Sequence, residues 1–275
     1  MLDWLAARYR HSSEALWRSR LEAGELRLEG RVARGGERLR PGQWLTWRRP
    51  PWSEPEAPAT CALLHRDEHL LAVAKPRGLP VLPGAGFLER TLLSVLRRLD
   101  PRAVPLHRLG RGTSGLVLAA RTPDARRGGA RAMRGGGVVK VYRTLVCGVP
   151  SRERFDVDVP IGPVPHPRLG RVHAASAGGR SAATRARVLG VRDGDAILEV
   201  RILTGRPHQI RIHMAAAGHP LRGDPLYAAG GGLAASPGLP GDPGYRLHAE
   251  RLELEHPISG RRLVLECPPP ASLRL

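Results

Sequence analysis

Cysteine is scarce in this chain of 275 residues, and the few cysteines lie far apart. They are Cys61, Cys147 and Cys267, and no Cys-x-x-Cys spacing occurs. A disulfide framework needs several cysteines, and zinc sites usually draw on such short spacings. The sequence therefore indicates neither, and we expect the three thiols to lie in the core.

Long apolar runs are also missing from the sequence. No segment approaches the roughly 18 uninterrupted apolar residues that a membrane-spanning helix requires. The N-terminus also lacks a basic region followed by an apolar one, which is the pattern of a secretory signal. We expect a cytoplasmic protein that makes no membrane contact.

Carboxylates are few beside the basic residues: 25 Asp and Glu against 44 Lys and Arg, which leaves a formal charge of +19. Only two of these basic residues are lysines, Lys75 and Lys140. A general bias toward arginine explains part of the excess but does not by itself explain the shortage of acids. Nucleic acid is the partner that such a charge favours over a merely solvated surface.

The hydrophobic content of 41% and the charged content of 25% are typical of a folded globular protein, although aromatic residues make up only 4%. Residues 1–49 are predicted to form a small unit of two helices followed by a β-ribbon. The second helix starts after Ser12 or Ser13 and ends at Gly24. Seven arginines between positions 18 and 40 suit either phosphate contacts or an ordinary solvated surface.

Residues 50–60 are rich in proline and are predicted to be a semi-rigid linker. Beyond them, strand-like and helix-like segments alternate, which predicts a mixed α+β domain over 61–270. The predicted strands cover 61–65, 69–74, 116–120, 138–146, 184–191 and 196–203, with a turn at Asp193-Gly194, and the predicted helices cover 91–99 and 124–134. Residues 228–244 are predicted to be a long loop.

The run Gly110-Arg111-Gly112-Thr113-Ser114-Gly115 matches the dinucleotide-binding pattern G-x-G-x-x-G. That pattern requires a helix after the glycines and an acidic residue about 20 positions later. Residues 116–120 favour a strand instead, and no acid occurs between 130 and 140. A dinucleotide site is therefore disfavoured, and the run is either a polar site loop or a plain turn.

A helix is predicted from about Pro207, which suits a first turn, to Gly218, which suits a C-terminal stop. On this helix His208 and Arg211 share a face, so the guanidinium is placed to meet a phosphate or a carboxylate. His208 and His213 are five residues apart, a poor spacing for joint metal ligation. We therefore expect no metal site.

Lys140 and Tyr142 share a face of the strand over 138–146, because side chains alternate along a strand. This places a cation next to an aromatic plane. Stacking of a nucleobase on Tyr142 is one interpretation, and an ordinary half-buried tyrosine is the other.

In this order along the chain, several motifs together resemble the RluA-type pseudouridine synthase family. They are Leu70 to Pro76, His107-Arg108-Leu109 with the glycine run, Lys140-Val141-Tyr142, Thr204 to His213, Gly223-Asp224-Pro225-Leu226-Tyr227 and Leu247-His248-Ala249. The resemblance spans residues 61 to about 267 and implies the mixed, mainly antiparallel sheet of that catalytic fold. The N-terminal unit is similar, more weakly, to the small RNA-binding domain that such synthases often carry.

The resemblance implies isomerisation of uridine to pseudouridine in ribosomal or transfer RNA, by a monomer that needs no cofactor and no metal. Tyr142 would stack on the base, and Arg211 would pair with the catalytic carboxylate and hold substrate. The remaining residues implied to bind RNA or the base are His107, Arg108, Arg111, Thr113, Ser114, Lys140, Arg206, His208 and Gln209.

The sequence departs from the family pattern at one position, where Gly110 stands in place of the catalytic aspartate. Two alternatives follow: another carboxylate reaches the pocket, or the protein is a pseudoenzyme that binds RNA without isomerising it. In the second case, Arg211 must meet another acid, a phosphate or solvent, because a buried unpaired cation is costly. The acids to test are Asp67, Glu68, Asp100 and Asp224, of which Asp224 is expected to be structural.

Overall fold

The computed structural model describes residues 1–9, 12–51 and 53–275 and divides into two compact units, Met1–Ser53 and Glu54–Leu275. The division falls inside the proline-rich segment over 50–60. The Glu54 carboxylate accepts hydrogen bonds from the backbone N–H groups of Leu88, Glu89 and Arg90, at 2.7–3.1 Å. The later part of that segment is therefore attached to the larger unit and is not a free linker.

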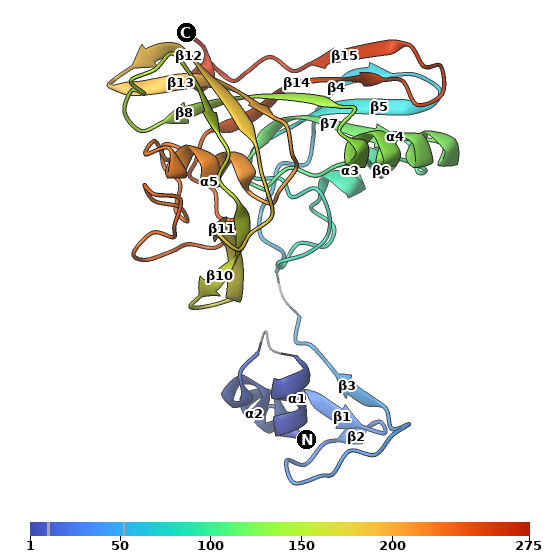
Figure 1. Ribbon diagram of the computed structural model, residues 1–275. Helices are drawn as coiled ribbons and strands as arrows, with labels where there is room; N and C mark the ends of the chain where they lie inside the picture. The colour runs from blue at the N-terminus through green and yellow to red at the C-terminus, as the bar shows by residue number, and fades with distance from the viewer. Residues whose placement is uncertain (10–11, 52) are drawn as a thin grey trace. The chain divides into compact units, whose positions relative to one another are not determined.

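The small unit has the predicted order of two helices and a β-ribbon (Figure 1). The Ser13 hydroxyl caps the second helix by accepting a hydrogen bond from the Leu16 N–H. The core of the small unit is formed by Leu5, Trp17 and Leu26, which are all buried. The elements are α1 (Leu2–Arg8), α2 (Glu14–Glu22), β1 (Leu26–Leu28), β2 (Arg31–Val32) and β3 (Leu45–Trp47).

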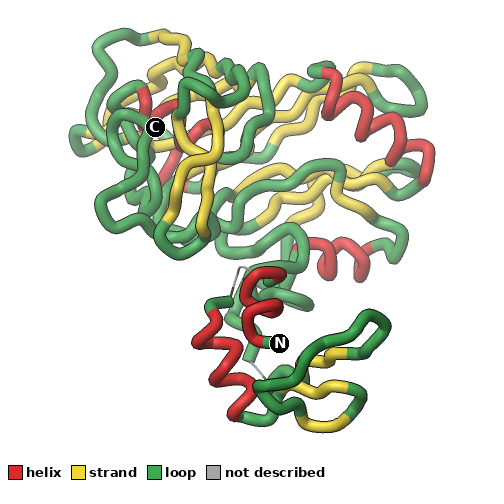
Figure 2. The backbone as a smooth tube through the Cα atoms, turned by 60° about the horizontal axis from the view of Figure 1, so that its bottom comes forward, coloured by secondary structure: helices red, strands yellow, loops and turns green. Residues whose placement is uncertain are grey.

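The large unit is built on a ten-stranded sheet in the order β4-β5-β7-β14-β8-β13-β12-β9, with β15 paired to β14 and β6 paired to β7 (Figures 1 and 2). A separate hairpin, β10-β11, lies beside it. The strands are β4 (Ala62–Arg66), β5 (Leu70–Lys75), β6 (Val104–Pro105), β7 (Ser114–Ala120), β8 (Val139–Val146), β9 (Arg154–Val157), β10 (Ile161–His166), β11 (Gly170–Ala175), β12 (Thr184–Arg192), β13 (Asp195–Ile202), β14 (Leu247–Glu255) and β15 (Arg262–Glu266).

Every pairing between the described strands is antiparallel except that of β7 with β14, so the predicted mixed and mainly antiparallel sheet is confirmed. This parallel pair places the loop before β7 next to the segment before β14. Gly115 makes the close approach possible, because a Cβ atom at this position would overlap the Ala249 backbone.

Two of the three longer helices of this unit begin at signals that the sequence carries. Thr91 caps α3 (Leu92–Leu99), and Thr122 followed by Pro123 begins α4 (Pro123–Gly135). The third helix, α5 (Gln209–Ala216), packs against β9, β12 and β13. Pro207 was predicted in the first turn of α5, but this prediction is wrong, because the N-cap residue is His208, in a left-handed conformation with φ of 56°.

The connection from α5 to β14, residues 217–246, contains no helix or strand, in agreement with the long loop predicted over 228–244 (Figure 1). It is fixed by backbone hydrogen bonds to the ends of α5 and β8, such as Gly230 N–H to Ala215 O at 2.8 Å and Cys147 N–H to Pro220 O at 2.9 Å. A short 3-10 turn, η1 (Ala271–Leu273), ends the unit.

The three cysteines of the large unit differ in how deeply they are buried. Cys267 is buried as expected, whereas Cys61 and Cys147 are only half-buried, so the core-thiol prediction is wrong for these two. No helix among the described residues is long and apolar enough to cross a membrane.

Candidate active site

A small cavity of about 120 Å³ lies where the loop before β7, strand β8, the start of α5 and the segment before β14 meet. Its walls contain most of the residues that the sequence singled out. The lining residues are Arg108, Leu109, Gly110, Thr113, Tyr142, Ile202, Arg206, His208, Gln209, Ile210, Arg211, Tyr245 and Leu247.

The loop before β7 is held at both ends by hydrogen bonds. His107 Nε2 accepts a hydrogen bond from the Leu118 N–H at 3.1 Å, and the Thr113 N–H donates to Gly110 O at 3.0 Å to form a turn. Burial, and to a smaller extent the charge of Lys140, lowers the pKa of His107 to about 4. His107 is therefore neutral at pH 7 and serves to anchor the loop.

Tyr142 supplies the aromatic surface of the cavity. It lies on β8 between its partners Val200 on β13 and Ala249 on β14, in the middle of the sheet. Burial raises its pKa to about 12, so the phenol keeps its proton at neutral pH. A neutral ring in this position offers a stacking surface for a base.

Arg211 is almost completely buried, with 3% of its side chain exposed, and it is not free. Its Nε and Nη2 atoms donate to the two carboxylate oxygens of Asp224, both at 2.7 Å, and Nη1 donates to Pro240 O at 3.0 Å. The guanidinium also lies over the rings of Tyr245 and Tyr227, at 4.2 and 5.0 Å from their centroids. Burial alone would lower the pKa of Arg211, but the hydrogen bonds and charge of Asp224 raise it.

Asp224 is the acid that Arg211 meets in the absence of an aspartate at position 110. Its side chain is 1% exposed, and one of its oxygens also accepts from the N–H groups of Leu226 and Tyr227, at 2.9 and 3.2 Å. Its two oxygens together accept four hydrogen bonds, and Asp224 does not line the cavity. This agrees with the expected structural role of Asp224.

The space that a side chain at position 110 would enter is already filled. A Cβ atom on Gly110 would lie 2.9 Å from the Tyr245 hydroxyl and 3.5 Å from Thr113 Oγ1, and no other atom of the described residues outside the immediate neighbours lies within 4 Å. Real Cβ atoms essentially never approach another heavy atom as closely as 2.9 Å. Glycine at 110 and tyrosine at 245 are thus sterically matched.

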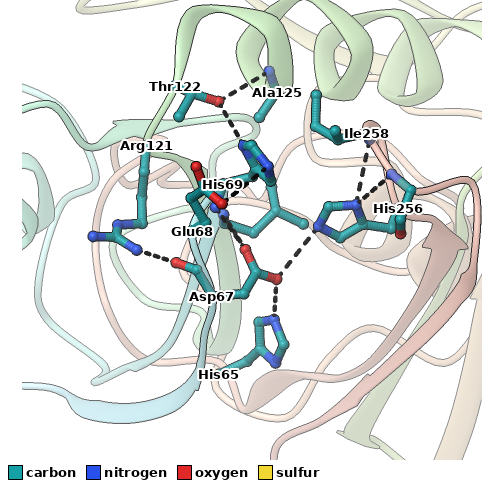
Figure 3. A network of polar contacts seen from close by, with 11 residues as sticks. His65, Asp67, Glu68, His69, Arg121, Thr122, Ala125, His256 and Ile258 are labelled. Atoms are coloured by element: carbon teal, nitrogen blue, oxygen red, sulfur yellow. Dashed lines mark hydrogen bonds and ion pairs between the residues drawn. The ribbon is translucent and has the colours of Figure 1, made fainter.

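The other candidate carboxylates are held elsewhere in the large unit. Figure 3 shows Asp67 between His65 and His256, with Oδ2 at 2.7 Å from His65 Nε2 and 3.3 Å from His256 Nε2. Glu68 is mostly exposed beside His69, and Asp100 is paired with Arg121 at 2.7 Å. None of these acids lines the cavity, so they do not replace the missing aspartate.

Three of the predicted base-binding residues occupy the α5 side of the cavity. Arg206 Nε donates to Ser181 O at 2.9 Å, and the Gln209 carbonyl accepts from the Arg206 N–H at 3.0 Å. His208 contacts the Tyr227 hydroxyl at 2.7 Å, and because this hydroxyl donates to His173 O, His208 Nδ1 is the donor. Burial, followed by the charge of Arg211, lowers the pKa of His208 to about 3, so its ring is neutral.

Four predicted site residues do not line the cavity: His107, Arg111, Ser114 and Lys140. Arg111 Nε donates to Gly241 O at 2.8 Å, and the Ser114 hydroxyl contacts His248 Nδ1 at 2.9 Å. Arg111 thereby fastens the loop before β7 to the segment that leads into β14, and Ser114 joins the start of β7 to the start of β14. These contacts indicate that Arg111 and Ser114 hold the loop of the site in place.

Tyr245 is the main site residue that the sequence interpretation missed. It lies two residues before Leu247-His248-Ala249, which enters the sequence analysis only through the family resemblance, and no local pattern marks a buried tyrosine there. A tyrosine is large enough to reach from the segment before β14 to the loop at 110, and such a long-range contact leaves no signal in local sequence. Among the described residues, no group of His, Cys, Asp or Glu side chains is arranged to hold a metal ion.

Comparisons with known proteins agree with this geometry. The sequence profile of RNA pseudouridylate synthases matches residues 69–216, which include the loop at 107–113, Tyr142 and Arg211. The chain is 43% identical to an uncharacterized RNA pseudouridine synthase of Synechocystis over 99% of its own length and 95% of that protein. The chain belongs to the RNA pseudouridine synthase family.

Two further relatives support the assignment. A ribosomal large subunit pseudouridine synthase D of Xanthomonas campestris is 36% identical over 92% of this chain and 80% of that protein. The solved structure of human RNA pseudouridylate synthase domain containing 1 matches with a TM-score of 0.64 and 25% identity, covering 81% of this chain and 89% of that one. The predicted family and fold class are confirmed, and the dinucleotide alternative is excluded, since β7 starts at Ser114 where that motif requires a helix.

Proposed function

We propose that this pseudouridine synthase acts on uridine in ribosomal RNA of the large subunit, with the cavity beside Tyr142 as its active site. The observation that supports this most strongly is that Tyr142 and the buried Arg211 line one small cavity together with the loop residues Arg108 to Gly110 and Thr113. The relative named for the large ribosomal subunit supports the choice of substrate.

In this proposal, the target nucleotide leaves its stack and enters the cavity, where the neutral ring of Tyr142 receives the uracil face. Unstacking costs a few kcal/mol, which phosphate contacts offset. The exposed Arg108 and the partly exposed Arg206 stand at the cavity for such contacts. The reaction consumes no oxidant or reductant, since uridine and pseudouridine are isomers.

A second candidate function is RNA binding without isomerisation. It is favoured by one observation, namely that none of the residues lining the cavity is an aspartate or a glutamate. We place either activity in the cytoplasm and expect a monomer, because the charge and the composition indicate a soluble RNA partner.

The substrate can be tested with unmodified transcripts of large-subunit ribosomal RNA and of transfer RNA, incubated with the full-length protein. Pseudouridine is quantified by mass spectrometry of the digested RNA. We expect at least a 100-fold larger kcat/KM on the ribosomal transcript. A preference for transfer RNA would refute the proposed substrate but not the reaction, and tight binding without product would favour the second candidate.

A further inference from the structure

The Tyr245 hydroxyl occupies the place of the side chain that position 110 lacks. It lies 2.9 Å from the point where a Cβ of residue 110 would be, while the rest of the tyrosine side chain stays more than 4 Å away from that point. Tyr245 is also among the largest completely buried side chains of the described residues, and it lines the cavity. The buried ring therefore holds the hydroxyl oxygen at one defined position, beside Gly110.

Two neighbouring side chains contact Tyr245, one at its hydroxyl group and one over its ring. Thr113 Oγ1 lies 3.2 Å from the Tyr245 oxygen, within hydrogen-bonding distance. The Arg211 guanidinium carbon lies 4.2 Å from the centre of the Tyr245 ring, over its face. A cation in this position stabilises negative charge that develops on the phenol oxygen when its proton leaves.

We propose that Tyr245 is the catalytic residue that replaces the aspartate in this chain, with its hydroxyl oxygen as the nucleophile at the ribose. This inference rests on the proposed function, since it assigns the reacting group within the same cavity. Tyrosine is chemically able to do this, because some glycosidases use a tyrosine nucleophile at a sugar carbon.

The steps balance without a co-reactant. The Tyr245 oxygen bonds to C1′ while the N1–C1′ bond breaks, its electron pair goes to N1, and the phenol proton passes to N1. After the neutral uracil has rotated, C5 bonds to C1′ and the oxygen–C1′ bond breaks. The C5 proton returns to the tyrosine oxygen, which restores the phenol and leaves pseudouridine.

The deciding experiment compares the wild type with Tyr245→Phe and with the double variant Gly110→Asp/Tyr245→Phe. The single change removes only the oxygen, so it should lower the single-turnover rate of pseudouridine formation at least 1000-fold. The double change returns a carboxylate to position 110, where the closest remaining atom to its Cβ would be Thr113 Oγ1 at 3.5 Å. We expect it to recover at least 10-fold of the lost rate, whereas Gly110→Asp alone, which clashes with the hydroxyl, should be inactive.

RNA affinity and the denaturation midpoint are measured on the same samples, because a merely structural role of Tyr245 would change these as well. We expect the RNA affinity of Tyr245→Phe to stay within two-fold of wild type. Wild-type activity that survives in Tyr245→Phe overturns this inference and leaves the proposed function intact. A wild type that forms no pseudouridine overturns the proposed function, and the assignment of Tyr245 with it.

Discussion

At the scale of single residues, the ion pair between Arg211 and Asp224 explains how a cation can be buried beside a cavity whose lining contains no acidic residue. Both side chains are at most 3% exposed, and two parallel hydrogen bonds join them. A buried pair of this kind does not necessarily stabilise a fold more than apolar residues would, but removal of one partner leaves an unpaired buried charge.

Asp224→Asn should therefore destabilise the protein by about 3–5 kcal/mol, as expected when one partner of a buried ion pair is lost. Denaturant unfolding followed by circular dichroism measures the change. The matched control is Asp242→Asn, because Asp242 is 36% exposed and lies 3.8 Å from Arg111. A change of less than about 1 kcal/mol is expected for this exposed pair. Equal effects of the two substitutions would contradict the structural role assigned to Asp224.

The site residues also show which contacts a sequence can predict. Arg211 and Tyr142 follow from their positions on a helix and a strand together with the family resemblance, and both line the cavity. The sequence also predicted that Arg211 needs another partner in place of the missing aspartate, and Asp224 was one of the acids named for testing. It did not reveal Tyr245, because the contact between positions 110 and 245 depends on the parallel pairing of β7 with β14.

At the scale of secondary-structure elements, caps and turns made most helices and strands predictable. Thr122-Pro123 begins α4, and Asp193-Gly194 joins β12 to β13, as expected from their sequences. The start of α5 was misplaced because His208 takes a left-handed conformation that a preceding proline does not indicate. The order of the strands in the sheet could be expected only from the family resemblance.

The β7–β14 pair gives a test at this scale. Gly115 has φ of +109°, and a Cβ on it would overlap the backbone of β14. Gly115→Ala should therefore separate the two strands and destabilise the large unit by more than about 3 kcal/mol, a large effect for a single substitution. Gly137→Ala is the control, because nothing lies within 4 Å of its Cβ position, and its effect should be within about 0.5 kcal/mol. Thermal unfolding of both variants checks this.

The turn between β4 and β5 should make stability depend on pH. Although burial by itself raises the pKa of Asp67, hydrogen bonds from His65 and from the N–H groups of Leu70 and His69 lower it to about 2, from an ordinary value of 3.8. A carboxyl whose pKa is depressed in the folded state contributes stability above its unfolded pKa and loses it as the pH falls through the folded value. This contribution is complete above about pH 4 and disappears as the pH falls toward 2.

Asp67→Asn should therefore flatten the dependence of the free energy of unfolding on pH between about 4 and 2. The difference from wild type should shrink as the pH falls through this range. Urea titrations at a series of pH values measure it, with Glu68→Gln as the control, since Glu68 is 85% exposed. A difference that stays constant across the range would show that Asp67 does not carry the effect.

At the scale of the whole molecule, the charge of +19 dominates the expected behaviour toward RNA. Binding that releases counterions from phosphates weakens steeply with salt. We expect the affinity for a ribosomal RNA fragment to fall at least 100-fold between about 50 and 200 mM salt. Fluorescence anisotropy measures it, and a peptide nucleic acid of the same base sequence, which has no phosphates, should show little dependence. A flat response with RNA would contradict the role of the basic surface.

The composition predicted this partner class correctly, because a large excess of arginine over acids has few other uses in a globular protein. It does not identify the RNA, since recognition of RNA by shape leaves no short code in the sequence.

We propose that this chain isomerises uridine although position 110 carries no carboxylate. The most direct measurement incubates the full-length protein with ribosomal RNA from cells that lack it and maps pseudouridine at single-nucleotide resolution. We expect pseudouridine to appear at a defined uridine and to reach one equivalent per RNA molecule. RNA that is bound by the protein but remains without any new pseudouridine would contradict it.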